Sequence, residues 1–131
     1  MKKEGIINEA ILRVIGSTGH TDQLVVCDAG LPIPRGVEKI DLAVVRGIVG
    51  FIEVLEPLLK EMVVEKMIVA SEIKIKSPAM YAQIIKLAGT IPVVEVSHEE
   101  FKIMTASAKA IIRSGECTPY ANVILQTGVN F

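Results

Sequence analysis

Hydrophobic and polar residues follow two different periods along this chain. Apolar residues three or four positions apart predict amphipathic helices, whereas short continuous or alternating apolar runs predict strands. The predicted helices cover residues 9–15, 51–63, 78–88 and a segment that starts at His98. The predicted strands cover residues 24–27, 37–42, 66–71, 91–96, 110–113 and 123–126.

Residues at the ends of several segments support these boundaries. Asn8 is a favourable N-cap for the first helix, and the Ser-Pro pair at 77–78 is typical of a helix start. Ser97 and Glu100 match the capping box, so the next helix should begin directly after Ser97. Pro57 is the weak point of the second helix, because a proline inside a helix lacks an N–H donor. It predicts a kink or a second helix start.

The order of the segments predicts the fold class. Strands alternate with helices over most of the 131 residues, a length that suits one domain. The last two strands have no helix between them, which indicates a mixed sheet. We therefore expect a single three-layer α/β/α domain over residues 1–131, with a largely parallel but mixed sheet that is covered on both faces.

Composition narrows the range of partners. The chain is 50% hydrophobic with a mean hydropathy of +0.48, yet no run reaches the length of a membrane span. The apolar excess therefore predicts contacts between subunits, hence a homo-oligomer and no membrane partner. The net charge is −1 and no basic run is present, which argues against nucleic acid as a partner.

The cysteines and the N-terminus indicate the compartment. Cys27 and Cys117 are the only two cysteines, they have no CxxC spacing, and Cys27 lies in an apolar run. The first five residues lack the apolar stretch of a secretory signal. These features predict a reduced, cytoplasmic protein.

Proton-handling side chains gather in a few polar runs at the ends of predicted elements. These are Gly-His-Thr-Asp at 19–22, the run from Asp28 to Pro34, Ser-His-Glu-Glu-Phe-Lys at 97–102, and Thr-Pro-Tyr-Ala-Asn at 118–122. Both histidines of the chain lie in them. Side chains at such edges can reach a small molecule without disturbing the core.

Together with Lys-Ile-Asp-Leu at 39–42, these runs resemble the ribose pyranase/fucose mutarotase family, over the whole of residues 1–131. The resemblance implies a D-ribose isomerase of ribose catabolism that interconverts pyranose and furanose rings without a cofactor or metal. It also implies ring-shaped homo-oligomers, often homodecamers, that bind the sugar between subunits. His20 would be the catalytic acid, and the sugar-binding residues would be Asp28, His98, Lys102, Tyr120 and Asn122.

The residues themselves fit this chemistry but leave simpler roles open. Ring opening needs one proton delivered to the ring oxygen and another removed from the anomeric hydroxyl, and histidine exchanges protons near neutral pH. His20 could equally be a turn residue bonded to the backbone. Asp28 could bind sugar hydroxyls or form an Asx-turn with Gly30.

The same holds for the other candidates. His98 and Lys102 lie four residues apart on one helix face, although each could simply be a surface residue. Tyr120 and Asn122 would point to the same side of an extended segment. Tyr120 could instead pack on Pro119.

One distance bears on assembly. His20 and Asp28 flank a strand that spans about 16 Å when straight, which is longer than a pentose. Either the segment after His20 folds back, or two subunits share the site, and we expect the shared site.

Two rival functions stay open. A fucose-type mutarotase, which interconverts anomers of a six-carbon sugar, would use similar residues. A non-catalytic sugar-binding accessory protein of an uptake system would keep Asp28, Tyr120 and Asn122 but would not depend on His20.

Overall fold

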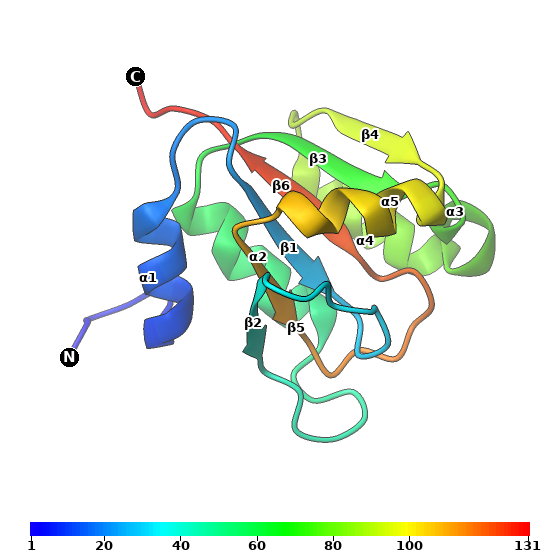
Figure 1. Cartoon of the computed structure of the whole chain (residues 1–131), viewed down its shortest axis with the longest axis horizontal. Coiled ribbons are helices and arrows are strands. Elements are labelled where there is room, and N and C mark those ends of the chain that lie inside the picture. Colours follow the sequence, from blue (N-terminus) through cyan, green and yellow to red (C-terminus); the bar gives the residue numbers. More distant parts are fainter.

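The computed structural model describes all 131 residues and contains six strands and five α-helices (Figure 1). The helices are α1 (Glu9–Ser17), α2 (Phe51–Glu61), α3 (Ile73–Lys76), α4 (Pro78–Ala88) and α5 (His98–Met104), with a 3-10 turn η1 (Thr105–Ser107). The strands are β1 (Gln23–Cys27), β2 (Glu38–Asp41), β3 (Val64–Ala70), β4 (Val93–Val96), β5 (Ala110–Arg113) and β6 (Val123–Thr127).

The strands form one mixed sheet in the order β2-β5-β1-β6-β3-β4. Strand β5 pairs in parallel with β1 and β2, and β3 pairs in parallel with β4. Strand β6 lies near the middle and is antiparallel to both of its neighbours, β1 and β3. The predicted largely parallel, mixed sheet is therefore confirmed.

Both faces of the sheet are covered, as a three-layer fold requires. Strand β1 shows this directly: Leu24 and Val26 pack into the core shared with α1, α2 and α4, whereas Val25 and Cys27 pack with Phe101 of α5 on the opposite face. Figure 1 shows α5 in front of the sheet and α2 and α4 behind it. No helix combines the length and the apolar character that crossing a bilayer requires.

The structure departs from the predicted elements in two places. Helix α3 was not predicted, because four residues are too short to show a helical period. Pro57 does not divide α2, and no second helix starts there. Phe51, Val54 and Leu58 on both sides of it are buried in the core, and this burial outweighs the missing hydrogen bond.

Ser77 precedes α4 as predicted, but its hydroxyl does not cap the helix. It donates instead to the carbonyl oxygen of Pro119 at 2.7 Å. This bond ties the start of α4 to the segment that carries Tyr120 and Asn122.

The strand directions sort the candidate residues onto two opposite edges of the sheet. Because β6 is antiparallel to β1 and β3, the other five strands all run in the same direction. The carboxyl edge, where those five strands end and β6 begins, carries Asp28, Glu72, His98, Tyr120 and Asn122. The amino edge, where those strands begin and β6 ends, carries His20, Glu65, Gln126 and the C-terminal residues 127–131.

Candidate functional site

Asp28 and Asn122 form a reciprocal pair on the carboxyl edge. The Asp28 N–H donates to Asn122 Oδ1 at 2.8 Å, and Asn122 Nδ2 donates to Asp28 Oδ2 at 3.0 Å. The other carboxylate oxygen of Asp28 accepts the N–H of Gly30 at 2.9 Å. Asp28 therefore forms the Asx-turn and is also held by a buried amide, so its carboxylate has a fixed direction.

This pair stands beside an open cavity of about 260 Å³. The rings of His98 and Tyr120 meet edge to face on its wall, with centroids 5.0 Å apart. A carboxylate, an imidazole and a phenol around one cavity can bind the hydroxyls of a sugar, and an aromatic face can cover its C–H groups. The residues that line the cavity are Asp28, Gly30, Leu31, Pro32, His98, Pro119 and Tyr120.

His98 is held by its backbone at the first position of α5. Ser97 Oγ accepts the N–H of Glu100 at 3.1 Å, which confirms the predicted cap. Both carboxylate oxygens of Glu72 accept the N–H of His98, at 3.0 and 3.1 Å, and this bond lowers the pKa of Glu72. The imidazole Nδ1 of His98 is buried and has no hydrogen-bond partner in the chain. Such an atom is costly to leave unpaired, and a sugar hydroxyl would satisfy it.

Tyr120 and Asn122 do not lie on an extended segment, so that prediction is wrong. Tyr120 has a φ of 62°, and the N–H of Ala121 donates to the Thr118 carbonyl at 3.3 Å. The resulting turn sends the two side chains apart: Tyr120 lines the cavity, whereas Asn122 is buried beside Asp28. Both still belong to the same edge.

Lys102 does not reach this cavity. Its ammonium group pairs with Glu99 Oε1 at 2.7 Å, one turn along α5 from His98. Within one chain, the structure gives Lys102 the role of a surface ion pair.

Burial raises the pKa of Asp28, although hydrogen bonds from Gly30, Asn122 and Leu31 act in the opposite direction. Burying the charged form costs folding free energy. Asp28 therefore stabilises the folded state at a pH below its unfolded-state pKa. This stabilisation is lost as the pH rises through the raised folded-state pKa.

Sugar binding should depend on the same titration with the opposite sign, because the carboxylate is the stronger hydrogen-bond acceptor. We expect the Kd for ribose to rise as the pH falls, with a midpoint above the ordinary aspartate value of 3.8. Calorimetric titrations at a series of pH values would measure it. The Asp28→Asn variant should still bind ribose, though weakly, because it retains His98. It lacks the titrating carboxylate of Asp28, so its Kd should not show this pH dependence. Equal pH profiles for wild type and variant would contradict the expectation.

The amino edge presents His20 on a tight turn of residues 19–22. The N–H of Thr21 donates to the Thr127 carbonyl at 2.9 Å, and the N–H of Thr127 donates to the Asp22 carbonyl at 2.9 Å. The carboxylate of Asp22 accepts the N–H of Gly19 and pairs with Lys109, each at 2.8 Å. The turn that carries His20 is thus fastened to the end of β6.

Two non-glycine residues adopt a left-handed backbone conformation. They are Thr21 (φ 68°), next to His20, and Tyr120 (φ 62°) on the other edge. A β-branched threonine is especially unfavourable there, and such residues cluster at functional sites. Each edge therefore has one strained residue within its candidate site.

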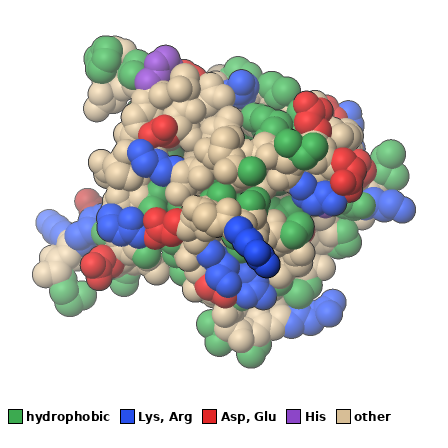
Figure 2. All heavy atoms as spheres, in the orientation of Figure 1, with side chains coloured by type: hydrophobic (Ala, Val, Ile, Leu, Met, Phe, Trp, Pro, Cys, Tyr) green, Lys and Arg blue, Asp and Glu red, His purple; other side chains and the backbone are tan.

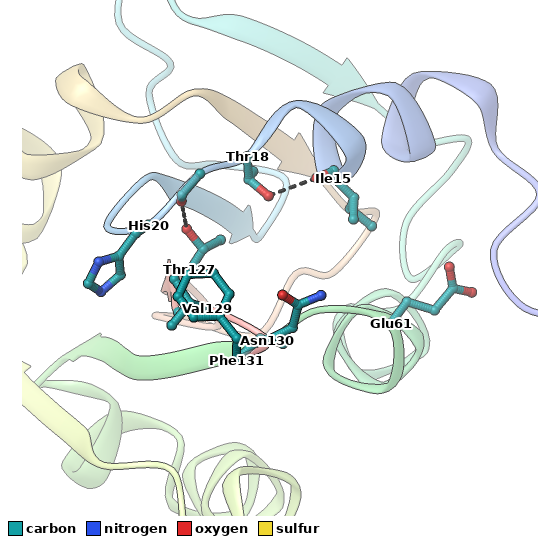
Figure 3. A pocket seen from close by; sticks show the side chains of 11 residues that line it. Ile15, Thr18, His20, Glu61, Thr127, Val129, Asn130 and Phe131 are labelled. Atoms are coloured by element: carbon teal, nitrogen blue, oxygen red, sulfur yellow. Dashed lines mark hydrogen bonds between the residues drawn. The ribbon is translucent and has the colours of Figure 1, made fainter.

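His20 lines a second cavity, of about 380 Å³, beside the end of β6. Figure 3 shows His20 at one side of the cavity, Thr127, Val129 and Phe131 as the labelled side chains nearest to it, and Glu61 on the far side. The ring is half exposed, and its Nε2 lies 3.0 Å from Glu65 Oε2. His20 is therefore more than a turn residue bonded to the backbone, because its ring meets a carboxylate and lines a cavity.

The two edges are not brought together within one chain. His20 precedes β1 and Asp28 follows it, and the straight strand between them spans about 16 Å. The segment after His20 does not fold back, since β1 is paired along its length with β5 and β6. Each cavity contains only part of the predicted set.

Sequence reasoning missed two carboxylates. Glu72 lies two residues after the end of the apolar strand β3, close to the position that Asp28 has directly after β1, and this placement was the available signal. Glu65 lies near the start of the same strand, where a single exposed acidic residue gives no signal without the tertiary contact to His20.

Comparison with known proteins decides the family. A model described as the RbsD / FucU transport protein family matches residues 1–130. This chain belongs to the RbsD/FucU family. Among its relatives, a protein of Coprothermobacter proteolyticus named D-ribose pyranase is 52% identical over 131 residues and is matched over the full length of both chains.

Solved structures of RbsD/FucU proteins agree with the fold. The Bacillus subtilis RbsD complexed with D-ribose is 47% identical, with a TM-score of 0.97 over all of both chains. The fucose mutarotase of Streptococcus pneumoniae in complex with L-fucose is 26% identical, with a TM-score of 0.78 over 95% of each chain. The predicted resemblance and the single-sheet α/β fold are confirmed.

Proposed function

We propose that this RbsD/FucU chain is a D-ribose pyranase that interconverts the pyranose and furanose forms of ribose. The observation that carries the proposal is the match in fold over the full length to the ribose-bound RbsD, at 47% identity. The fucose mutarotase is the more distant relative, in both identity and TM-score.

The reaction needs only proton transfers. An acid delivers a proton to the ring oxygen while the bond from that oxygen to the anomeric carbon breaks. A base removes the proton of the anomeric hydroxyl, whose oxygen becomes the aldehyde carbonyl. Closing the ring through a different hydroxyl repeats the two transfers in reverse, so the protons balance over the cycle.

The cavities on the amino and carboxyl edges, each of which we call a half-site, supply groups suited to these proton transfers. We assign His20 the role of the acid, because an imidazole can give and regain a proton near neutral pH. Asp28, whose raised pKa makes it a better proton acceptor than an exposed aspartate, would take the anomeric proton or bind that hydroxyl. His98, Tyr120 and Asn122 would orient the sugar.

We further propose that one sugar lies between two copies of the chain, with the amino edge of one against the carboxyl edge of the next. The separation of His20 and Asp28 across β1 supports this arrangement. Lys102 could join the site only if its ammonium group left Glu99 and contacted the sugar or the neighbouring copy instead.

Exposed apolar side chains support an assembly of this kind. Val44, Val45 and Ile48, in the loop between β2 and α2, are each more than half exposed. Figure 2 shows hydrophobic side chains on this loop at the lower end of the molecule. We propose a homo-oligomer, with the homodecamer of the family resemblance as the expected form. Both cysteines are free thiols, in keeping with a cytoplasmic location.

Saturation-transfer NMR on ribose at equilibrium tests the function. Saturating the β-pyranose anomeric signal should transfer to the furanose signals faster with catalytic amounts of protein than in buffer. Rapid α/β exchange of fucose without transfer between ribose rings would instead assign the chain to the mutarotases. No acceleration with either sugar would favour a sugar-binding accessory protein.

A further inference from the structure

Glu65 occupies an irregular position in the sheet. Along β3 and β6, Val64 pairs with Thr127 and Lys66 pairs with Gln126, so Glu65 is an extra residue without a partner on β6. An extra residue of this kind is a β-bulge, which redirects a side chain and is common beside active sites. Here the bulge lies on the amino edge, next to the turn of His20.

The carboxylate of Glu65 is held from both sides. Gln126 Nε2 donates to Oε1 at 2.6 Å, and His20 Nε2 lies 3.0 Å from Oε2. The hydrogen bond from Gln126 has the larger effect and the contact with His20 the next, and both lower the pKa of Glu65. The carboxylate therefore stays ionised. Gly128 leaves space for the Glu65 side chain. A Cβ at position 128 would lie 3.3 Å from the Cβ of Glu65, which is closer than such atoms usually pack.

An ionised carboxylate only accepts hydrogen bonds, so the proton between Glu65 and His20 must lie on Nε2. The other ring nitrogen, Nδ1, makes no hydrogen bond within the chain. In the neutral imidazole Nδ1 is then a proton acceptor, and in the imidazolium form it is a proton donor.

We propose that Glu65 is a positioning residue that fixes the imidazole of His20 with Nε2–H toward its carboxylate and Nδ1 toward the sugar. This inference rests on the proposed function, in which His20 is the catalytic acid. During ring opening, Nδ1–H gives its proton to the ring oxygen as the bond to the anomeric carbon breaks. Nδ1 regains a proton from the hydroxyl that closes the new ring. Glu65 keeps its charge throughout and takes no proton.

The tautomer of His20 tests the contact without any turnover. The chain has only two histidines, so a 15N-histidine-labelled His98→Gln protein shows His20 alone. Its neutral ring should be almost entirely the Nε2–H form, and Glu65→Ala should add a measurable Nδ1–H population. Glu95→Ala is the matched control, because Glu95 is also a strand carboxylate with a similar exposure, paired with Lys74 at 3.1 Å. An unchanged tautomer ratio in Glu65→Ala would overturn the proposal.

Kinetics test whether the orientation matters. On the wild-type background Glu65→Ala should lower the ribose exchange rate at saturation by up to about 10⁴-fold, the loss seen elsewhere when the carboxylate that orients a catalytic histidine is replaced, with little change in Kd. Glu65→Gln, which keeps the size of the side chain in the bulge, should act in the same direction with a smaller effect. A shifted tautomer with an unchanged exchange rate overturns the positioning role. Absence of exchange in the wild-type protein itself is a failure of the proposed function, and is seen before any variant is made.

Discussion

Replacing His20 with alanine is expected to abolish most of the enzymatic exchange between ribose rings while leaving ribose binding nearly intact. General acid catalysis contributes about 10²- to 10⁴-fold, and the variant should lose an amount in that range. Binding should persist because the cavity of Asp28, His98 and Tyr120 lies on the opposite edge of the sheet. Saturation-transfer NMR would give the rate and calorimetry the Kd.

Two controls make this result specific to His20. Glu95→Ala removes an exposed carboxylate that lines neither cavity and should leave the exchange rate unchanged. Free imidazole added to His20→Ala should restore part of the exchange, after subtraction of the same imidazole with ribose alone. An exchange rate in His20→Ala within about twofold of wild type, far less than general acid catalysis contributes, would remove His20 from the mechanism.

Mixing two inactive variants is expected to regenerate activity. His20→Ala damages only the amino edge and Asp28→Asn only the carboxyl edge. If a site is built from one edge of each of two copies, random reassociation leaves about a quarter of the sites with both edges intact. The variants would be dissociated together, reassembled and assayed, and each variant treated alone should stay inactive.

A second mixture separates shared sites from sites within one chain. Wild type is reassembled with an equal amount of the double variant His20→Ala/Asp28→Asn. Shared sites predict that about a quarter of all sites are intact, whereas sites within one chain predict about half. No activity in the first mixture, together with about half of the sites intact in the second, would show that the two edges do not meet between copies.

The regular part of the fold could be predicted from sequence because its signals are local. The apolar run of residues 24–27 and the Ser97 cap each report on a few neighbouring residues, and β1 and α5 lie where these signals place them. Helix α3 gave no such signal. Pro57 gave a misleading one, because the local cost of a proline is smaller than the burial of the helix face around it.

The candidate sites could be predicted only in part, for the same reason. Asp28 lies at the end of an apolar strand, and that position alone made it a candidate. Its partnership with Asn122 joins residues 94 positions apart in sequence and depends on the reversed direction of β6. The contact of Glu65 with His20 depends on a bulge, which no residue type marks.

If the site is shared between copies, the opposite placement of the two edges makes catalytic activity depend on protein concentration. A dissociated subunit would hold the proposed acid, His20, and the proposed base, Asp28, on opposite edges of one sheet, so it could not complete the proton transfers alone. With sites shared between copies, the activity per chain should fall on dilution as the assembly dissociates by mass action. A ribose molecule held between two copies would bind the associated form more tightly than the separate subunits, so it should oppose that loss. The substrate would then act as a stabilising ligand of the quaternary structure that converts it.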